Sequence, residues 1–249
     1  MSPIILTMPL KNAASTLQKA IDSVLSQQNV QRPIVLLVGN DASKDDSLKL
    51  LNQYLPNPQL HILNVNFGKA YLNRNFLNQY ARAMFPNAAF IGRLDADDFI
   101  ASNQTIAKIE TIFDATGFDV FFCGNYQSCS GQILPQPNKA DKRFLQKEYL
   151  IQRLWAMAQG DSTAELASCN VFIRPTVTIE YPSVTSAEDH WFSVLLLLEQ
   201  HRLKIQIDEN LLYCVYSLSG ELTHQNLKKE IYLKSRLDLY HFFKNKHHV

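Results

Sequence analysis

Apolar residues in the first half of the chain alternate between short continuous runs and stretches with helical spacing. The short runs, which are typical of buried strands, cover residues 4–8, 34–38, 60–65, 88–94 and 119–126. Helices are predicted between them over residues 15–25, 46–54, 71–84 and 102–115. Ser15 is the expected N-cap of the first helix. This alternation predicts right-handed crossovers and a mainly parallel sheet with helices on both faces.

The second half of the chain has a less regular pattern. Turn-forming residues over 128–142 predict a hairpin or a loop. Helices are expected over residues 147–158, 187–201 and 225–245, and strands over 168–174, 204–207 and 211–217. Because no repeat or low-complexity linker separates the halves, the sequence predicts one α/β domain over residues 1–224, followed by a helical extension over 225–249.

Composition narrows the class of protein. The 249 residues include 24 Lys+Arg and 23 Asp+Glu, and this balance argues against a dedicated nucleic-acid binder. No apolar run approaches the roughly 20 residues of a membrane span. The cysteines form no CxxC pair, which argues against structural zinc; they are Cys123, Cys129, Cys169 and Cys214. With no leader-like pattern before the first strand, we expect a cytoplasmic protein with reduced, mostly buried thiols.

Polar residues follow each of the first four predicted strands. They are Asn12 after the first strand; Asn40, Asp41 and Ser43 after the second; Asn66 and Gly68, with Arg74 in the helix behind, after the third; and Asp95, Asp97 and Asp98 after the fourth. Ligands of open parallel sheets bind beyond the carboxyl ends of the strands, so these side chains are expected to converge on one pocket. Helix capping is the competing explanation for Ser43, Asp45 and Ser102. Helix capping does not explain the three carboxylates of Asp95, Asp97 and Asp98, which repel one another unless a cation compensates them.

Two acidic motifs carry candidate chemistry. On an extended segment, Asp95 and Asp97 would project to the same side, and such a pair suits Mg²⁺ or Mn²⁺ that also binds substrate phosphates. The sequence has no Gly-rich phosphate loop, so metal and side chains are expected to hold phosphate instead. Glu188 and Asp189 begin a predicted helix, where they either complement the helix dipole or supply a general base.

Several motifs in order resemble a known family. They are Pro9-Leu10-Lys11-Asn12, Ile21-Asp22-Ser23-Val24-Leu25-Ser26-Gln27, Val38-Gly39-Asn40-Asp41-Ala42-Ser43-Lys44-Asp45, Asn66-Phe67-Gly68 with Asn73-Arg74-Asn75, Arg93-Leu94-Asp95-Ala96-Asp97-Asp98, and Glu188-Asp189. This order resembles the family 2 glycosyltransferases of the GT-A (Rossmann-like) fold, bacterial surface-polysaccharide transferases in particular. The resemblance covers roughly residues 4–220.

The resemblance implies a role for individual residues. Asp41 matches the aspartate that recognises uracil, and Asp97 matches the direct metal ligand of the family's DxD motif. Asp189 matches the catalytic base, with Glu188 beside it. The nucleotide-sugar pocket is expected to include Pro9, Asn12, Asp41, Gly68, Arg74, Asp95, Ala96, Asp97 and Asp98, with Asp95 as a further metal ligand. Residues 216–223 resemble the family's closing loop.

Two positions depart from the family pattern. Asn40 stands where many members have a second aspartate, which is a common variant. Ala42 replaces a glycine, so a positive φ at this position would bring strain.

The resemblance implies an inverting glycosyltransferase that depends on Mn²⁺ or Mg²⁺. Its donor would be a nucleotide sugar, UDP-linked by resemblance, and its acceptor a glycan or lipid-linked glycan in cell-surface polysaccharide synthesis such as LPS, O-antigen or capsule. Two alternatives remain. A sugar nucleotidyltransferase would be expected to carry a Gly-rich, basic signature after the first strand, and a non-catalytic binding subunit would be expected to lose Asp97 or Asp189.

The C-terminal segment permits two interpretations. Residues 225–249 hold six Lys+Arg and two acidic residues. An apolar stripe is expected at Leu227, Ile231, Leu237, Tyr240 and Phe243. Such a helix either lies peripherally on the anionic inner face of the cytoplasmic membrane or packs on the catalytic domain or a second subunit.

Overall fold

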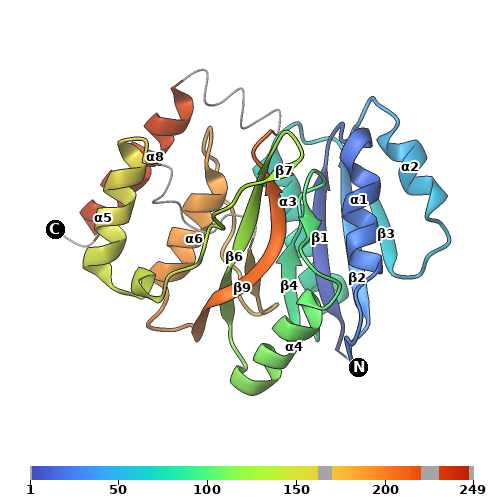
Figure 1. The fold of residues 1–249 in the computed structure, drawn as a ribbon, viewed down its shortest axis with the longest axis horizontal. Helices are drawn as coiled ribbons and strands as arrows, with labels where there is room; N and C mark the ends of the chain where they lie inside the picture. Colours follow the sequence, from blue (N-terminus) through green and yellow to red (C-terminus); the bar gives the residue numbers. More distant parts are fainter. Residues whose placement is uncertain (1, 162–169, 220–229, 247–249) are drawn as a thin grey trace.

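A computed structural model describes residues 2–161, 170–219 and 230–246 as one sheet with helices on both faces (Figure 1). The strands are β1 (Ile4–Leu10), β2 (Ile34–Asp41), β3 (Leu60–Val65), β4 (Phe90–Arg93), β5 (Phe99–Ile100), β6 (Val120–Cys129), β7 (Gln132–Ile133), β8 (Val171–Ile173) and β9 (Ile205–Ser217). The helices are α1 (Ala14–Leu25), α2 (Ser47–Gln53), α3 (Ala70–Met84), α4 (Thr105–Thr116), α5 (Lys147–Ala158), α6 (Glu188–Leu198) and α8 (Ile231–Lys246), with a 3₁₀ turn over Lys142–Leu145. The predicted α/β class is confirmed.

The sheet is parallel over β1 to β4, where the sequence pattern is clearest, and it is mixed over the remaining strands. Its strand order is β3-β2-β1-β4-β8-β6-β9-β5, and β1 to β4 pair in parallel. β8 lies between β4 and β6 and pairs antiparallel with both. β4 and β6 therefore run in the same direction but are separated by β8. A Cβ on Gly92 would lie 2.4 Å from the ring of Phe172, so β8 fits beside β4 because Gly92 has no side chain.

Several local predictions need correction. The strands predicted over 204–207 and 211–217 form the single strand β9, whose polar stretch produces register shifts against β6 rather than a break. β5, which pairs with the end of β9, was not predicted. The predicted hairpin is confirmed by β6 and β7.

Ser15 is not the N-cap of α1, which begins at Ala14. The free backbone N–H groups of Ala13 and Ala14 donate instead to Ser47 Oγ at 3.0 Å and Asp45 Oδ2 at 2.9 Å. Both acceptors follow β2. The helix start is therefore capped from another loop of the fold, an arrangement that α1's own sequence does not reveal.

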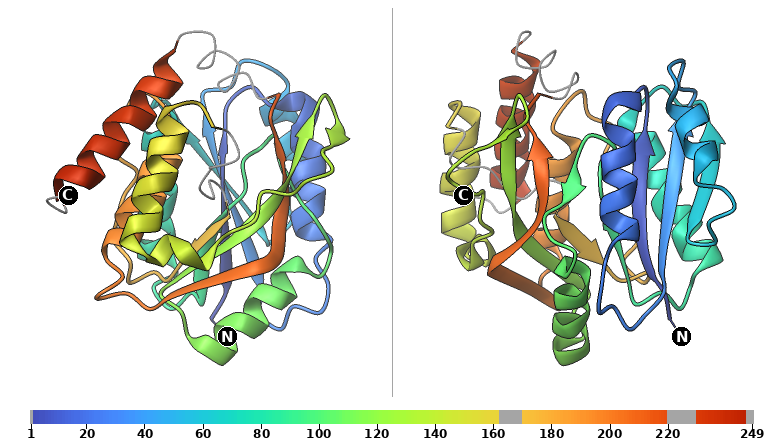
Figure 2. Two further views of the ribbon diagram at one scale, coloured as in Figure 1. Left: turned by 60° about the vertical axis from the view of Figure 1, so that its left-hand side comes forward. Right: turned by 45° about the vertical axis from the view of Figure 1, so that its right-hand side comes forward.

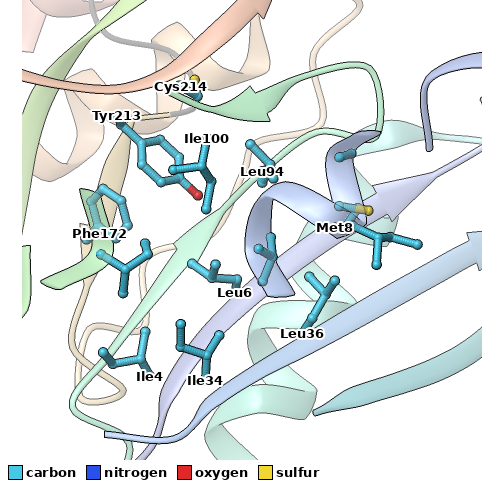
Figure 3. Packing of buried hydrophobic residues seen from close by; sticks show 14 of the residues in the cluster. Ile4, Leu6, Met8, Ile34, Leu36, Leu94, Ile100, Phe172, Tyr213 and Cys214 are labelled. Atoms are coloured by element: carbon cyan, nitrogen blue, oxygen red, sulfur yellow. The ribbon is translucent and has the colours of Figure 1, made fainter. Parts of the chain in front are cut away.

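Alternating strand residues divide the core between two faces. Leu6 of β1 packs with Leu17 of α1 and Ile106 of α4, whereas Ile5 packs with Leu77 of α3. Figure 3 shows the first face, where Ile4 and Leu6 lie beside Ile34 and Leu36 of β2, together with Phe172 and Tyr213. Apolar side chains on both faces of the central strands are what a sheet covered on both sides requires.

The C-terminal helix packs on the rest of the domain. α8 runs beside α5 (Figure 2), and the rings of Trp155 and Tyr240 lie 5.0 Å apart. Leu239 and Phe243 are buried, whereas Leu237, placed on the predicted stripe, is only partly buried. Leu227 lies outside the described residues. In the described part of the chain no helix is both long and apolar enough to cross a membrane.

The described cysteines carry free thiols. Cys123 and Cys214 are buried, as expected, and Cys129 is exposed. Cys169 lies outside the described residues.

Ala42 adopts the strained conformation that its sequence position suggested. Its φ is +49°, directly after β2, where an alanine Cβ is disfavoured. We expect Ala42→Gly to raise the free energy of unfolding by about 0.5–1 kcal/mol, because glycine removes this strain at some entropic cost. Urea unfolding of the two proteins measures the change. A less stable glycine variant would show that the backbone here is not strained.

Candidate functional site

Asp41, at the end of β2, organises the loop that follows β3. Its carboxylate is buried, and Oδ1 accepts hydrogen bonds from the backbone N–H groups of Phe67 at 2.6 Å and Gly68 at 3.0 Å. Gly68 has a φ of +66°, which suits glycine. Lys11 Nζ lies 3.5 Å from Asp41 Oδ2. The predicted base-recognising aspartate therefore also fixes the loop beside it.

Two asparagines join the loops at this edge of the sheet. Asn12 Oδ1 accepts from the Lys44 N–H at 2.7 Å, and the Asn12 N–H donates to Ser43 Oγ at 3.0 Å. Asn40 Nδ2 donates to Asn64 Oδ1 at 2.9 Å and so connects the ends of β2 and β3. Pro9 lies within β1, opposite Gly39. The loops after β1, β2 and β3 thus meet, as predicted.

The four residues Asp95 to Asp98 form a tight turn rather than the extended segment expected from the sequence. The Asp98 N–H donates to the Asp95 carbonyl at 3.0 Å, and the carbonyl of buried Ala96 accepts from Thr16 Oγ1 at 2.9 Å. Burial and the neighbouring Asp95 carboxylate raise the pKa of Asp97 to about 6. The charges of Arg74 and Arg93 offset this effect only in part, and a bound cation would further favour the charged form of Asp97.

Asp98 has a different environment from the other two aspartates. Its side chain is buried, and Oδ1 accepts from the Ser217 N–H at 2.8 Å. Asp98 therefore holds the end of β9 against the acidic turn. This contact supports the shape of the site. It leaves the Asp98 carboxylate buried and does not expose it to a ligand.

Two arginines, the buried Arg93 and the largely buried Arg74, connect the acidic turn to the acidic pair. Arg74 of α3 forms ion pairs with Asp95 at 3.2 Å and with Glu188. Arg93, at the end of β4, lies 3.1 Å from the same Asp95 and 3.8 Å from Asp189. Residues far apart in the sequence therefore form one charged network. These ion pairs offset the cost of burying the carboxylates.

Tyr181 packs beneath this network. The guanidinium carbons of Arg74 and Arg93 each lie 5.6 Å from the centre of its ring, and Arg93 Nη1 donates to its hydroxyl at 3.1 Å. The ring stacks on Phe192 of α6 at 4.1 Å. Tyr181 thus braces both arginines against the helix that carries the acidic pair.

The acidic pair begins α6 immediately after a strained residue. Ala187 has a φ of +56°, and Glu188 and Asp189 form the first turn of the helix. Burial would raise the pKa of Asp189, but its interactions with His190, Arg93 and Arg74 outweigh burial and hold this pKa below its usual range. Asp189 retains an exposed fraction of 16% and is ionised at neutral pH, as a general base must be.

The residues of the acidic turn supply only part of the ligand set that a divalent ion requires. Asp97 is the more available carboxylate, because within the described ranges it forms no ion pair, although the charges of Arg74 and Arg93 act on it. Asp95 is already held by Arg74 and Arg93. Among the described residues no three His, Cys, Asp or Glu side chains form a metal-binding group. Asp97 would therefore hold the ion together with ligands from the substrate, the arrangement that Mg²⁺ commonly adopts.

Two members of this network were not assigned a role from the sequence. Arg93 directly precedes the acidic motif, and its spacing of two from Asp95 was an available signal. Tyr181 lies in a segment without regular structure and has no comparable signal. The structure brings Arg74 and Asp95 together, as expected for residues that follow neighbouring strands, and adds Glu188 and Asp189 to them. Residues 220–223 of the expected closing loop lie outside the described residues.

Comparisons with solved structures identify the fold. Residues 1–349 of S. aureus TarS in complex with UDP match with a TM-score of 0.66 and 18% identity, over 94% of this chain and 65% of that one. The same protein with UDP-GlcNAc matches with a TM-score of 0.66 and 19% identity, over 89% and 60%. The mannosyltransferase PcManGT from Pyrobaculum calidifontis, in complex with GDP-Man and Mn²⁺, matches with a TM-score of 0.61 and 12% identity, over 90% and 60%. The chain spans less than two thirds of these relatives' lengths.

Comparisons of sequence identify the family. No curated protein matches the chain. The profile of glycosyl transferase family 2 matches residues 6–175, which include every strand and helix from β2 to β8 and the acidic turn. The match covers well over half of the chain, and the fold agrees with it. The chain belongs to glycosyl transferase family 2.

Proposed function

We propose that this protein transfers a sugar from a nucleotide sugar to an acceptor hydroxyl, with inversion at the anomeric carbon. The observation that carries the proposal is the charged network that joins the acidic turn after β4 to the acidic pair of α6 through Arg74 and Arg93. The network joins Asp95 to Asp189. Asp95 lies in the same turn as Asp97, whose carboxylate could hold a metal–diphosphate complex, and Asp189 is an ionised carboxylate suited to proton abstraction.

In the proposed reaction, the acceptor oxygen attacks the anomeric carbon while the bond from that carbon to the diphosphate oxygen breaks. The electron pair of the broken bond leaves with the nucleoside diphosphate, and Asp189 accepts the proton of the acceptor hydroxyl. A divalent ion bound at Asp97 would neutralise charge on the leaving diphosphate. Arg74 and Arg93 hold Asp95 and the acidic pair in position.

The donor is proposed to be a UDP-sugar, with Mn²⁺ or Mg²⁺ as the ion. Complexes of structural neighbours with UDP, UDP-GlcNAc and GDP-Man support a nucleotide-sugar donor, and the Mn²⁺ in one of them supports a metal. Asp41, Gly68 and Asn12 lie on the loops where the nucleotide would bind.

The acceptor is proposed to be a glycan or lipid-linked glycan of a cell-surface polysaccharide. The resemblance of the N-terminal motifs to surface-polysaccharide transferases supports this class of acceptor. Exposed basic residues on α8, such as Lys234 and Lys246, support a peripheral contact with an anionic membrane on the cytoplasmic side.

A thermal-shift experiment tests the donor site without knowledge of the acceptor. UDP with Mn²⁺ at about 100 times its Kd is expected to raise the melting temperature by about 5–10 °C, because a ligand that binds only the folded state stabilises it. The shift should require the metal and should be lost in Asp97→Ala.

Asp238→Ala, which removes an exposed aspartate on α8, is the matched control and should keep the shift. GDP and CDP with Mn²⁺ measure the preference for the base. An equal shift in Asp97→Ala would remove Asp97 from the metal site. The absence of a shift with every nucleotide would contradict the proposed donor site.

A further inference from the structure

α8 contacts the turn that carries the acidic pair. Ser235 is buried, and its Oγ donates to the Ser186 carbonyl at 2.5 Å and accepts from Trp191 Nε1 at 3.3 Å. Both partners flank Glu188 and Asp189 in the sequence. A single hydroxyl on the C-terminal helix thus joins the residues before and after the acidic pair.

The buried face of α8 carries two polar residues, Ser235 and Arg236. Leu239 and Phe243, one and two turns further along, are apolar and pack in the core. A buried hydroxyl is costly unless both its donor and its acceptor capacity are used, and here they are. The position of Ser235 is therefore explained by the turn that it contacts, whereas an apolar residue would suffice for packing.

The turn needs support because it is strained. Ala187, between Ser186 and Glu188, has a φ of +56°, a conformation that a residue with a Cβ keeps only when its surroundings enforce it. On the helix side, the Trp191 N–H donates to the Ala187 carbonyl at 3.1 Å. On the other side, Ser235 holds the Ser186 carbonyl. The direction of the first turn of α6, and so of its carboxylates, depends on both contacts.

We propose that Ser235 is a positioning residue, which orients the acidic pair by holding the Ser186–Ala187 turn from α8. The inference rests on the proposed function, in which Asp189 is the general base. It gives the C-terminal helix a role in catalysis, although α8 lies beyond the part of the chain that the family profile matches.

Amide hydrogen exchange of the full chain tests the structural part. Ser235→Ala is expected to raise exchange in peptides covering residues 185–192 by about fivefold, as expected for the loss of one buried hydrogen bond. Ser235→Thr keeps the hydroxyl and should restore protection. Phe243→Leu is the matched control, because it shortens a buried side chain of the same helix about 12 Å from Ser235. It should leave exchange in this turn unchanged.

Kinetics test the catalytic part. Release of nucleoside diphosphate is measured from UDP-GlcNAc and GDP-mannose with Mn²⁺ and water as the acceptor. In Ser235→Ala we expect kcat to fall about 10-fold or more with the donor KM within twofold, because a misaligned base slows chemistry without weakening donor binding. Ser235→Thr should recover most of kcat. Phe243→Leu should lower the melting temperature without this loss.

The outcomes separate the inference from the proposed function. Unchanged exchange in residues 185–192 of Ser235→Ala, or an unchanged kcat, would overturn the role of Ser235. A fall in kcat that Phe243→Leu reproduces at equal loss of melting temperature would overturn it as well. If the unaltered protein released no nucleotide from either donor, the proposed function would be contradicted, and hydrogen exchange would still decide whether Ser235 holds the turn.

Discussion

Asp189→Asn is expected to lower the rate of sugar transfer about 10²-fold or more, which is the scale of a general-base contribution. Asparagine has nearly the same shape as aspartate, but it cannot accept the acceptor proton. The Asp189 side chain lies at the edge of the Arg93 network, 3.8 Å from the guanidinium group, so its replacement leaves the donor side of the site in place. Donor affinity should therefore change little.

The measurement is steady-state kinetics together with the thermal shift that UDP and Mn²⁺ produce. Glu199→Gln, at the opposite end of α6, provides the control because it removes a carboxylate whose ion pair, among the residues that the structure describes, is with Arg202 on the surface. That variant should keep normal rates. Turnover near the normal value in Asp189→Asn would remove Asp189 from the role of base.

Arg93→Met is expected to lower the free energy of unfolding at pH 7 by about 3–5 kcal/mol. The Arg93 side chain is only 4% exposed, and it lies between Asp95, Asp189 and the Tyr181 hydroxyl. Methionine fills similar space but leaves these carboxylates with less positive charge nearby. The cost arises from burying unpaired charge more than from lost packing.

The pH dependence of this loss in unfolding free energy shows whether it arises from unpaired charge or from poorer packing. In the unaltered protein the pKa of Asp189 is lowered in the folded state, so its stabilising contribution is present above the unfolded pKa and is lost as pH falls through the folded pKa. Without Arg93, burial raises the folded pKa of Asp189, and the carboxyl group becomes protonated more readily on acidification. The difference in stability between the two proteins should therefore shrink as pH falls below the ordinary aspartate pKa of about 4 toward the folded value of about 2.

Denaturant unfolding at several pH values measures this difference. Arg82→Met is the matched control, because Arg82 also lies on the α3 side of the fold but donates to the Val177 carbonyl rather than pairing with the acidic motifs. Its effect should be small and nearly independent of pH. A loss in Arg93→Met that stays constant with pH would show that packing, not charge, explains the role of Arg93.

The sequence by itself determined the elements of the first half and the chemistry at their ends. Residues 60–65 and 147–158 were predicted with the bounds that the structure has. The helix buries Leu150, Leu154 and Met157 at helical spacing, whereas the strand buries only Leu60. The order of Asp41, Asp95 and Asp97 after successive strands pointed to one edge of the sheet. The family followed from the same motifs, and its profile matches them.

Other features depend on contacts between distant segments. β8 inserts antiparallel between β4 and β6, β9 continues through its polar stretch, and Asp45 and Ser47 support the start of α1 from another loop. A local pattern of apolar residues records how much of a segment is buried, but not which segment covers it. Strand pairing and capping of this kind were therefore beyond the sequence.

The candidate site, like the fold, could be predicted from the sequence only in part. The sequence supplied the carboxylates and Arg74, because residue type and motif spacing are local properties. Only the tertiary structure showed that Arg93 and Tyr181 join the acidic turn to the acidic pair, and that Ser235 of α8 holds the turn before Glu188. Burial and pairing set the charge state of each carboxylate, and both arise only when separate elements pack together.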